Sequence, residues 1–248
     1  LAVALEALAA RQPQRPLMYA PGQRAATWDD LRAQAALVRE RLHAGGFAAG
    51  DLIVGCIQSR PCLALACATL PVASTFVPLA TTLALAEYRA LFDRLRPRAV
   101  LTDGDAAQPF TVAARERGIA RLHAAPIVAA SCGRFRLELL DGCGPAWTPR
   151  RVGPQCAYLV VTSGTTGRPK IVPAGHRQLI AFLGRLTDWL RLIPDDVGCS
   201  VMPFHFAGGL RGTLLATLAS GGSVVCLPER DVTGLVEARG TYGVTWYG

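Results

Sequence analysis

One segment of this chain, Tyr158-Leu-Val-Val-Thr-Ser-Gly-Thr-Thr-Gly-Arg-Pro-Lys170, carries most of the information about its fold. An apolar, β-branched run enters it, and the residues that follow, Ile171-Val-Pro-Ala-Gly175, are again extended in character. Four hydroxyl side chains and two glycines fill the six positions 162–167. Hydroxyls and free backbone amides beside a lysine are the chemistry of anion binding. The segment therefore predicts a phosphate loop that joins two extended segments.

This loop has two other interpretations, a polar turn without a ligand and a Walker A loop. A polar turn without a ligand is one, because Gly, Ser and Thr are common in turns. Against it, 25 of the 26 strongly basic residues are arginine, and the single lysine of the chain is Lys170. A compact ammonium group is not interchangeable with a guanidinium at a phosphate. A Walker A loop of a nucleotide hydrolase is the other, but its G-x-x-x-x-G-K-[ST] spacing is missing and the next helix begins only near His176.

Extended and helical segments alternate along most of the chain. Thr27 caps a first helix, which Gly45-Gly46 ends. Extended segments are predicted at 52–57, 75–79, 99–102, 157–161, 198–202, 223–227 and 244–247, and helical ones at 61–70, 85–95, 176–192 and 210–218. Residues 104–154 are less regular, with Phe135–Leu140 as the clear strand. This alternation predicts an α/β fold with helix-covered, largely parallel sheets.

Composition excludes several classes of protein. With 248 residues, 51% of them hydrophobic and 18% charged, and a mean hydropathy of +0.28, the chain is not disordered. Its length suits one large domain or two small ones. The net charge of +8 comes from scattered arginines without a run or interleaved aromatics. That distribution indicates a general surface bias and no nucleic-acid partner, and it leaves an anionic substrate open.

Cysteines and uncharged residues raise two structural alternatives. The eight cysteines form no C-x-x-C pair and most lie in apolar runs, which indicates reduced core residues in a cytoplasmic protein. The four histidines have no metal-site spacing, so no metal ligand is identified. The 26 residues 61–86 carry no charge and are long enough to span a bilayer. Pro71 and Pro78 interrupt them, which favours a buried helix followed by a buried strand.

The two ends of the chain suggest a piece of a longer protein. The N-terminus lacks an initiator Met and the basic region of a signal peptide. At the other end, 244–247 forms a strand that arrives at a turn, with nothing after Gly248. Open parallel sheets carry their chemistry beyond the carboxyl ends of their strands. We therefore expect site residues beyond the end of this chain.

Residues 162–170 resemble the phosphate-loop signature of the adenylate-forming superfamily, which includes acyl-CoA synthetases, luciferases and the adenylation domains of peptide synthetases. The resemblance extends over essentially the whole chain, in the order Thr27-Trp-Asp-Asp-Leu31, Gly50-Asp-Leu-Ile-Val54, Leu70-Pro-Val-Ala-Ser-Thr-Phe-Val-Pro78, Pro97-Arg-Ala-Val-Leu-Thr-Asp103 and Met202-Pro-Phe-His-Phe-Ala-Gly-Gly-Leu210. It implies that residues 1–248 are a partial large N-terminal lobe of an AMP-binding (adenylation) domain. The resemblance also implies that this large lobe is incomplete at its C-terminus and that the small C-terminal lobe is absent from residues 1–248.

What the resemblance implies is a two-step ligase reaction. A small carboxylic acid attacks the α-phosphate of ATP with the help of Mg²⁺, and the acyl-adenylate then passes its acyl group to the thiol of CoA or of a carrier-bound phosphopantetheine. The implied ligands of the ATP phosphates are Thr162, Ser163, Gly164, Thr165, Thr166, Gly167 and Lys170. Ile171 and Gly175-His176 depart from the family's usual Gly and Ser/Thr-His.

The second implied site surrounds His205. The resemblance makes His205 a candidate catalytic residue and places His205, Phe206, Gly209 and Trp246 in the substrate pocket. Without the resemblance, His205 would be interpreted as an ordinary half-buried histidine and Trp246 as a core residue. Amino-acid-activating domains have an aromatic–acidic pair in this region, so Phe204-His205 favours an acyl or aryl acid.

The resemblance also defines what this chain lacks. The family's adenine- and Mg²⁺-binding segment, ribose-binding aspartate, hinge and catalytic lysine of the small lobe would follow Gly248. We therefore expect these 248 residues alone to show no pyrophosphate exchange. Carrier proteins or neighbouring synthetase domains are the expected protein partners, and no membrane span is expected. The alternative function is a truncated or degenerate adenylation-like module that serves as a non-catalytic docking or scaffold domain.

Overall fold

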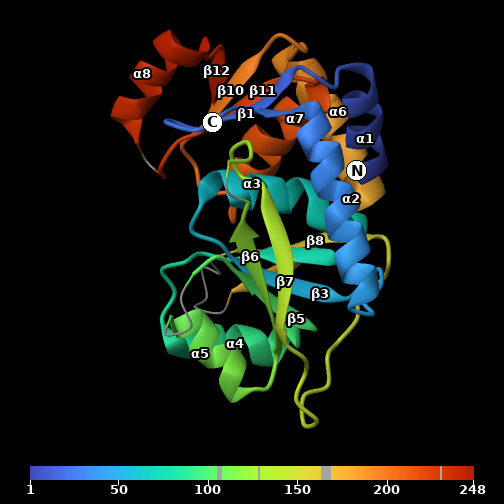
Figure 1. Cartoon of the computed structure of the whole chain (residues 1–248). Coiled ribbons are helices and arrows are strands. Elements are labelled where there is room, and N and C mark those ends of the chain that lie inside the picture. Colours follow the sequence, from blue (N-terminus) through green and yellow to red (C-terminus); the bar gives the residue numbers. More distant parts are fainter. Residues whose placement is uncertain (105–107, 128, 163–168, 230) are drawn as a thin grey trace.

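The structure, a computed structural model, describes residues 1–104, 108–127, 129–162, 169–229 and 231–248. It is an α/β fold with two mostly parallel sheets covered by helices, as the alternation predicts (Figure 1). The helices are α1 Ala2–Arg11, α2 Trp28–Ala44, α3 Arg60–Thr69, α4 Leu85–Leu95, α5 Pro109–Glu116, α6 His176–Leu190, α7 Ala216–Ser220 and α8 Val232–Tyr242, with a 3-10 turn η1 Leu70–Val72 and a π-helix η2 Gly208–Leu215. The strands are β1 Pro16–Tyr19, β2 Ala26–Thr27, β3 Leu52–Cys56, β4 Thr75–Pro78, β5 Ala99–Thr102, β6 Ala120–Pro126, β7 Phe135–Asp141, β8 Cys156–Thr162, β9 Lys170–Gly175, β10 Val197–Ser200, β11 Ser223–Cys226 and β12 Trp246–Tyr247.

Both sheets are parallel in their interior and antiparallel at an edge. The larger sheet has seven strands in the order β7-β6-β5-β3-β4-β8-β9, in which only β7 and β9 run against their neighbours. The smaller sheet has five strands in the order β12-β10-β11-β1-β2, with β2 antiparallel to β1. Parallel strands joined by crossovers send their carboxyl ends to one edge. Each sheet therefore has one edge at which loops and functional side chains gather.

The core is layered because successive side chains of a buried strand point to opposite faces. In β3, Ile53 joins the core between the two sheets, whereas Leu52 and Val54 pack against α4 and α5 on the outer face. In β11, Val224 and Val225 divide in the same way between the central core and the layer under α8. Helix α3 lies between the two sheets (Figure 1). The fold is thus built from helix and sheet layers around one shared central core.

The uncharged stretch 61–86 forms buried structure within this core. All residues of α3 and all of β4 are buried, which confirms the prediction of a buried helix followed by a buried strand. Pro71 lies in the 3-10 turn and Pro78 ends β4, so neither proline interrupts a hydrogen-bonded helix. No helix in the described part of the chain is both long and apolar enough to cross a membrane.

The cysteines are mostly core residues. All eight are free, and six of them are buried, which confirms the prediction for those six. Cys143 is exposed and Cys156 is half-buried, so the prediction of core cysteines does not hold for this pair. Burial raises the pKa of the Cys56 thiol to about 11, which keeps it protonated at neutral pH.

Several element boundaries agree with the sequence patterns, and others do not. Thr27 caps α2 in a capping box with Asp30, and α4 and β5 have the predicted bounds. The stretch near 104–154 is more regular than we expected, because α5 and β6 precede β7. The alternation also gave no indication of α1, β1, β2 or α8.

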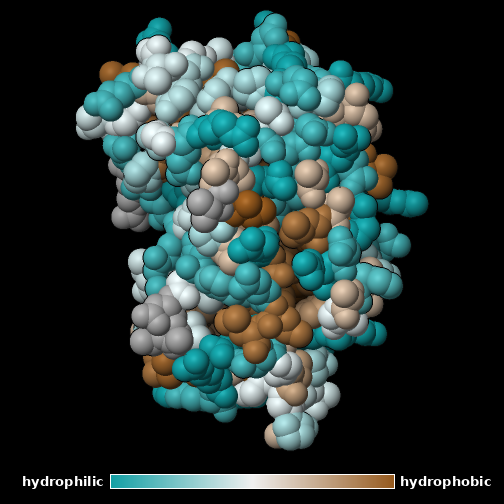
Figure 2. All heavy atoms as spheres, viewed as in Figure 1, coloured by the Kyte–Doolittle hydropathy of each residue, from teal (hydrophilic) through white to brown (hydrophobic). Residues whose placement is uncertain are grey.

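Strand β7 forms one edge of the seven-stranded sheet. Its Leu139 and Leu140 are 53% and 50% exposed, and Figure 2 shows apolar side chains gathering on this face of the molecule, where β7 runs. Earlier in the strand, exposed Arg136 and Glu138 alternate with buried Phe135 and Leu137. Charged residues on an edge strand disfavour pairing with another chain.

Candidate functional site

The two ends of the predicted phosphate loop lie side by side. Thr162 ends β8 and Lys170 begins β9, and the two residues are directly opposite in the antiparallel register. Lys170 is exposed and Thr162 is half-buried. The other five predicted phosphate ligands, at 163–167, lie outside the described residues. The strand after Lys170 confirms that the loop joins two extended segments and is not followed by the helix of a Walker A loop.

The orientation of these end residues follows from strand alternation. In β8, Tyr158 and Val160 face the central core between the two sheets, whereas Leu159 faces the outer layer. Residues directly opposite in an antiparallel pair share a face. Thr162 and Lys170 therefore lie on the face of the seven-stranded sheet that looks toward the five-stranded sheet.

The exit of the loop is held by the outer helix α4. Arg94 of α4 donates a hydrogen bond from Nη1 to the carbonyl of Pro169 at 2.8 Å. Pro169 immediately precedes Lys170, so this contact fixes the backbone from which the lysine side chain extends. The contact fixes only the backbone at this point, and the Lys170 side chain itself is exposed.

His205 lies in a turn after β10, and we call residues 200–206 the His205 turn. The amide of Phe206 donates to the carbonyl of Pro203 at 3.1 Å, and the imidazole is half-buried, with its ring centre 4.4 Å from that of Phe206. Burial lowers the pKa of His205, the charge of Arg60 lowers it further, and Glu229 opposes both. The imidazole is therefore neutral at pH 7, with one nitrogen as donor and the other as acceptor.

Arg60 also lies in this region, although it was not predicted from the sequence. It is the first residue of α3, after β3 of the seven-stranded sheet, and its guanidinium donates to the carbonyls of Ser200 and Met202 after β10 of the other sheet. The carboxyl edges of the two sheets thus meet at Arg60. β8 is separated from β3 only by β4, which is about 10 Å across the sheet. A signal existed, since Arg60 is the charged residue that directly precedes the uncharged stretch 61–86.

Gly209 and Phe206, two other predicted pocket residues, have different surroundings. Gly209 is buried, and a Cβ there would stand 2.3 Å from the carbonyl oxygen of Pro203. The π-helix η2 thus needs glycine in order to approach the His205 turn. Phe206 is 41% exposed and offers an apolar surface next to the imidazole.

Trp246, the last predicted pocket residue, lies in β12 beside β10. It pairs with Gly198, and a Cβ on Gly198 would be 2.9 Å from the indole Nε1. The ring is half-buried against the central core, and its buried Nε1 has no hydrogen-bond partner among the described groups. Because β12 and β10 are parallel, the residues that follow Trp246 reach the same sheet edge as the His205 turn.

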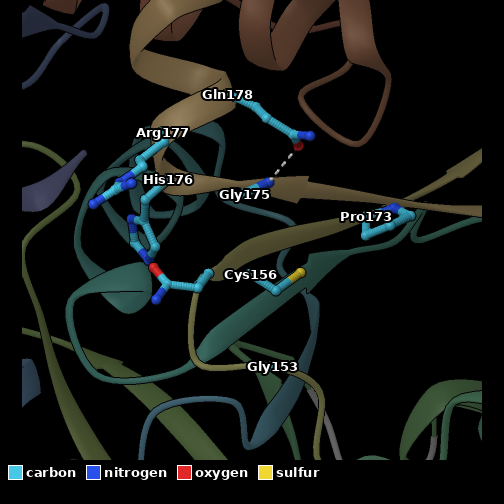
Figure 3. A pocket seen from close by; sticks show the side chains of 8 residues that line it. Gly153, Cys156, Pro173, Gly175, His176, Arg177 and Gln178 are labelled. Atoms are coloured by element: carbon cyan, nitrogen blue, oxygen red, sulfur yellow. Dashed lines mark hydrogen bonds between the residues drawn. The ribbon is translucent and has the colours of Figure 1, made fainter.

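A separate cavity of about 500 Å³ lies at the other end of the β8–β9 pair, and Figure 3 shows it. Cys156 begins β8 there and Gly175 ends β9, with the Gly175 amide donating to Gln178 Oε1 at 3.2 Å. The sulfur of Cys156 points away from His176 (Figure 3). Six residues of strand, about 20 Å, separate Cys156 from Thr162. This cavity is therefore distinct from the predicted phosphate loop.

In the described ranges, no three His, Cys, Asp or Glu side chains come together as metal ligands. For Mg²⁺, which the resemblance implies, these residues therefore offer no such ligand set.

Comparison with known proteins identifies the family. Residues 5–248 match the family described as AMP-binding enzyme. The chain belongs to this family. Sulfoacetate–CoA ligase from Cupriavidus necator is 26% identical over 252 residues, which cover 99% of this chain and 48% of the ligase. L-proline–[L-prolyl-carrier protein] ligase from Streptomyces coelicolor is 31% identical over 241 residues, which cover 89% of this chain and 44% of that protein.

Solved structures share the AMP-binding fold. Apo MatB from Rhodopseudomonas palustris superposes with a TM-score of 0.76 at 22% identity, over 96% of this chain and 48% of MatB. At this level of identity the match shows the fold. The chain spans about half the length of the curated relatives that it matches.

Proposed function

We propose that the protein carrying this chain activates a small carboxylic acid with ATP and transfers its acyl group to a thiol. In the first step a carboxylate oxygen attacks the α-phosphorus, the bond to the β-phosphate oxygen breaks, and pyrophosphate leaves. In the second step a thiolate sulfur attacks the acyl carbon, and AMP leaves with the electrons of the C–O bond. The observation that carries the proposal is the direct pairing of Thr162 with Lys170 on the face that looks toward the His205 turn.

In this proposal the segment between Thr162 and Lys170 binds the β- and γ-phosphates. Hydroxyls and amides at 162–167 surround the phosphate oxygens, and the Lys170 ammonium balances the charge that grows as pyrophosphate leaves. A lysine on an exposed strand end suits this role, because its flexible stem follows the leaving group. The backbone of Pro169 stays in place through Arg94.

His205 borders the acyl group in the same proposal. Its neutral imidazole has a donor nitrogen for a carboxylate or carbonyl oxygen, and the exposed ring of Phe206 supplies apolar contact beside it. Neither residue is acidic, so the turn offers no counter-charge for a substrate ammonium group. We therefore favour an acyl or aryl acid over an amino acid. The acceptor is CoA or a carrier-bound phosphopantetheine, since the relatives named above include a CoA ligase and a carrier-protein ligase.

The experiment is acid-dependent exchange of labelled pyrophosphate into ATP by the full-length protein, over a panel of acyl, aryl and amino acids. We expect exchange with an acyl or aryl acid, and a loss of roughly 100- to 1,000-fold in Lys170→Ala, the range for removal of one charge-stabilising donor. Arg177→Ala is the matched control, because Arg177 is an exposed cation at the far end of the β8–β9 pair. Its exchange rate should stay near that of the wild type.

The alternative function, a non-catalytic docking or scaffold module, predicts no exchange with any acid. Unchanged exchange in Lys170→Ala would refute the role of the lysine while leaving the ligase activity in place. A preference for amino acids would overturn the assignment of the acid class.

A further inference from the structure

Arg60 is a buried cation whose described side-chain contacts go to residues that end or follow strands β10 and β11. Its side chain is 8% exposed, and Nη2 donates to the carbonyls of Ser200 at 2.9 Å and Met202 at 3.1 Å. The guanidinium carbon lies 4.3 Å from the ring centre of Phe204. Nη1 lies 3.6 Å from the carboxylate of Glu229, and it and Nε have no hydrogen-bond partner among the described groups.

Stability alone does not account for this arrangement. Burying a guanidinium carries a large desolvation cost, and an apolar side chain of similar volume is often as stabilising. Glu229, the one carboxylate of the described ranges within ion-pair distance, is 43% exposed, so solvent screens part of its attraction. The neighbouring residues of α3 are all buried and would accept an apolar side chain. The positive charge and its fork of donors therefore need another explanation.

The hydrogen bonds and the ring contact of Arg60 with the five-stranded sheet fall on the residues that lead to His205, and its ion pair goes to Glu229 after β11. The two carbonyls and the ring belong to positions 200, 202 and 204, every second residue before the histidine. The backbone that precedes Arg60 is fixed as well, because Asp103 after β5 accepts hydrogen bonds from the amides of Gln58 and Ser59 at 2.8 Å each. The His205 turn is thus tied through Arg60 to the carboxyl edge of the seven-stranded sheet.

We propose that Arg60 is a positioning residue for His205. It holds the His205 turn against the start of α3 and so sets where the imidazole stands relative to the phosphate loop on the other sheet. The proposal rests on the proposed function in one respect, that His205 borders the bound acid. A planar guanidinium suits the task because its Nη2 donates to two carbonyls while its flat face lies over a ring, a fixed planar geometry that the compact Lys ammonium does not have.

Arg60 also adds to the effect of burial in lowering the pKa of His205. Among the residues that the structure describes, the charged groups that act on His205 are Arg60 from α3 and Glu229 from the segment after β11. The positive charge lowers the pKa of His205 and the negative charge raises it, so removing Arg60 raises the pKa and removing Glu229 lowers it further. A structural role without electrostatic coupling would leave this pKa unchanged.

The test combines histidine NMR with kinetics on Arg60→Met, Arg60→Lys and Glu229→Gln. Titration of ¹⁵N-labelled imidazoles, with the His205 signal assigned from His205→Gln, should show a higher His205 pKa in Arg60→Met, a lower one in Glu229→Gln, and little change in Arg60→Lys. In the full-length protein, kcat/KM for the acid should fall about 10- to 100-fold in Arg60→Met. Arg60→Lys keeps the charge but loses the fork, so it should not restore kcat/KM.

Arg98→Met is the matched control. Arg98 also lies over an aromatic ring, with its guanidinium carbon 4.5 Å from the ring centre of Phe47. Unlike Arg60, however, it precedes β5 at the opposite edge of the same sheet. A folded Arg60→Met with unchanged His205 pKa and unchanged acid kcat/KM would overturn the proposal, as would an equal loss in Arg98→Met or full rescue by Arg60→Lys. If Arg60→Met does not fold, the kcat/KM of Arg60→Lys still tests the positioning role, because a loss supports it and wild-type activity overturns it. Absence of exchange in the wild type would instead refute the proposed function, while the NMR titration would still test the coupling of Arg60 to His205.

Discussion

At the scale of single residues, Gly209 decides how closely η2 approaches the His205 turn. A Cβ at this position would lie 2.3 Å from the carbonyl oxygen of Pro203 and 2.8 Å from that of Met202, distances that force backbone to move. The family resemblance places Gly209 in the substrate pocket, and the structure adds a packing reason for glycine there. These two roles make different predictions for the same substitution.

We expect Gly209→Ala to lower the free energy of unfolding by about 1–3 kcal/mol, the usual cost of overpacking. Gly212 in the same π-helix is the control, because a Cβ there meets nothing within 4 Å, and Gly212→Ala should be neutral or stabilising by up to about 1 kcal/mol. Urea unfolding of the three proteins measures both effects. A Gly209→Ala variant of full stability that has lost only acid binding would show that the pocket role is the whole explanation.

Residue chemistry also explains what the sequence could indicate about the site. Composition was enough to predict Thr162 and Lys170 as candidates, because hydroxyls, glycines and a lone lysine gather in nine residues. His205 needed the family resemblance, since one histidine carries no spacing of its own. Arg60 could not be assigned, because its partners lie 140 and 142 residues away in the chain, on the other sheet.

At the scale of elements, strong local signals predicted structure well. α4 combines Glu87 in its first turn with an amphipathic face, and β5 is a short apolar run, so both have the predicted bounds. β6, Ala120–Pro126, contains Arg121 and His123 and does not alternate cleanly, and it was missed. β2 has two residues, too few for any periodicity. Such strands are specified by their neighbours in the sheet and not by their own pattern.

Asp51 connects three elements of the seven-stranded sheet at the edge opposite the candidate site. Its buried carboxylate, just before β3, accepts hydrogen bonds from Arg98 before β5 at 2.8 Å, from Arg151 before β8 at 2.5 Å, and from the Ala48 amide at 2.9 Å. Burial raises the pKa of Asp51, but these hydrogen bonds and charges outweigh it, so the pKa lies below its ordinary 3.8.

A depressed carboxylate pKa stabilises the fold above the ordinary value, and that contribution is lost as pH falls through the folded-state pKa. We expect Asp51→Asn to destabilise the protein by about 2 kcal/mol at pH 7 and to flatten the loss of stability below pH 3.8. Denaturant unfolding across pH 2–7 measures this, with Asp93→Asn as control, since Asp93 is 58% exposed in its pair with Arg117. An Asp51→Asn variant whose acid unfolding matches that of the wild type would contradict the role of Asp51.

At the scale of the whole molecule, the sequence predicted parallel, helix-covered sheets but not their number or membership. β1, near the N-terminus, inserts between β2 and β11, so the smaller sheet joins segments about 200 residues apart in the chain. Nothing local in either segment encodes that pairing. This pairing brings the carboxyl edges of both sheets to Arg60 and directs the His205 turn toward the sheet that carries the predicted phosphate loop.

The most direct test of this arrangement is a crystal structure of the full-length protein with a non-hydrolysable acyl-sulfamoyl adenosine. We expect the sulfamate, which stands in for the α-phosphate, to lie between the 162–170 loop and the His205 turn, with the acyl chain against His205 and Phe206. An analogue bound instead in the cavity beside Cys156 and His176, or bound with its acyl chain away from His205, would contradict it.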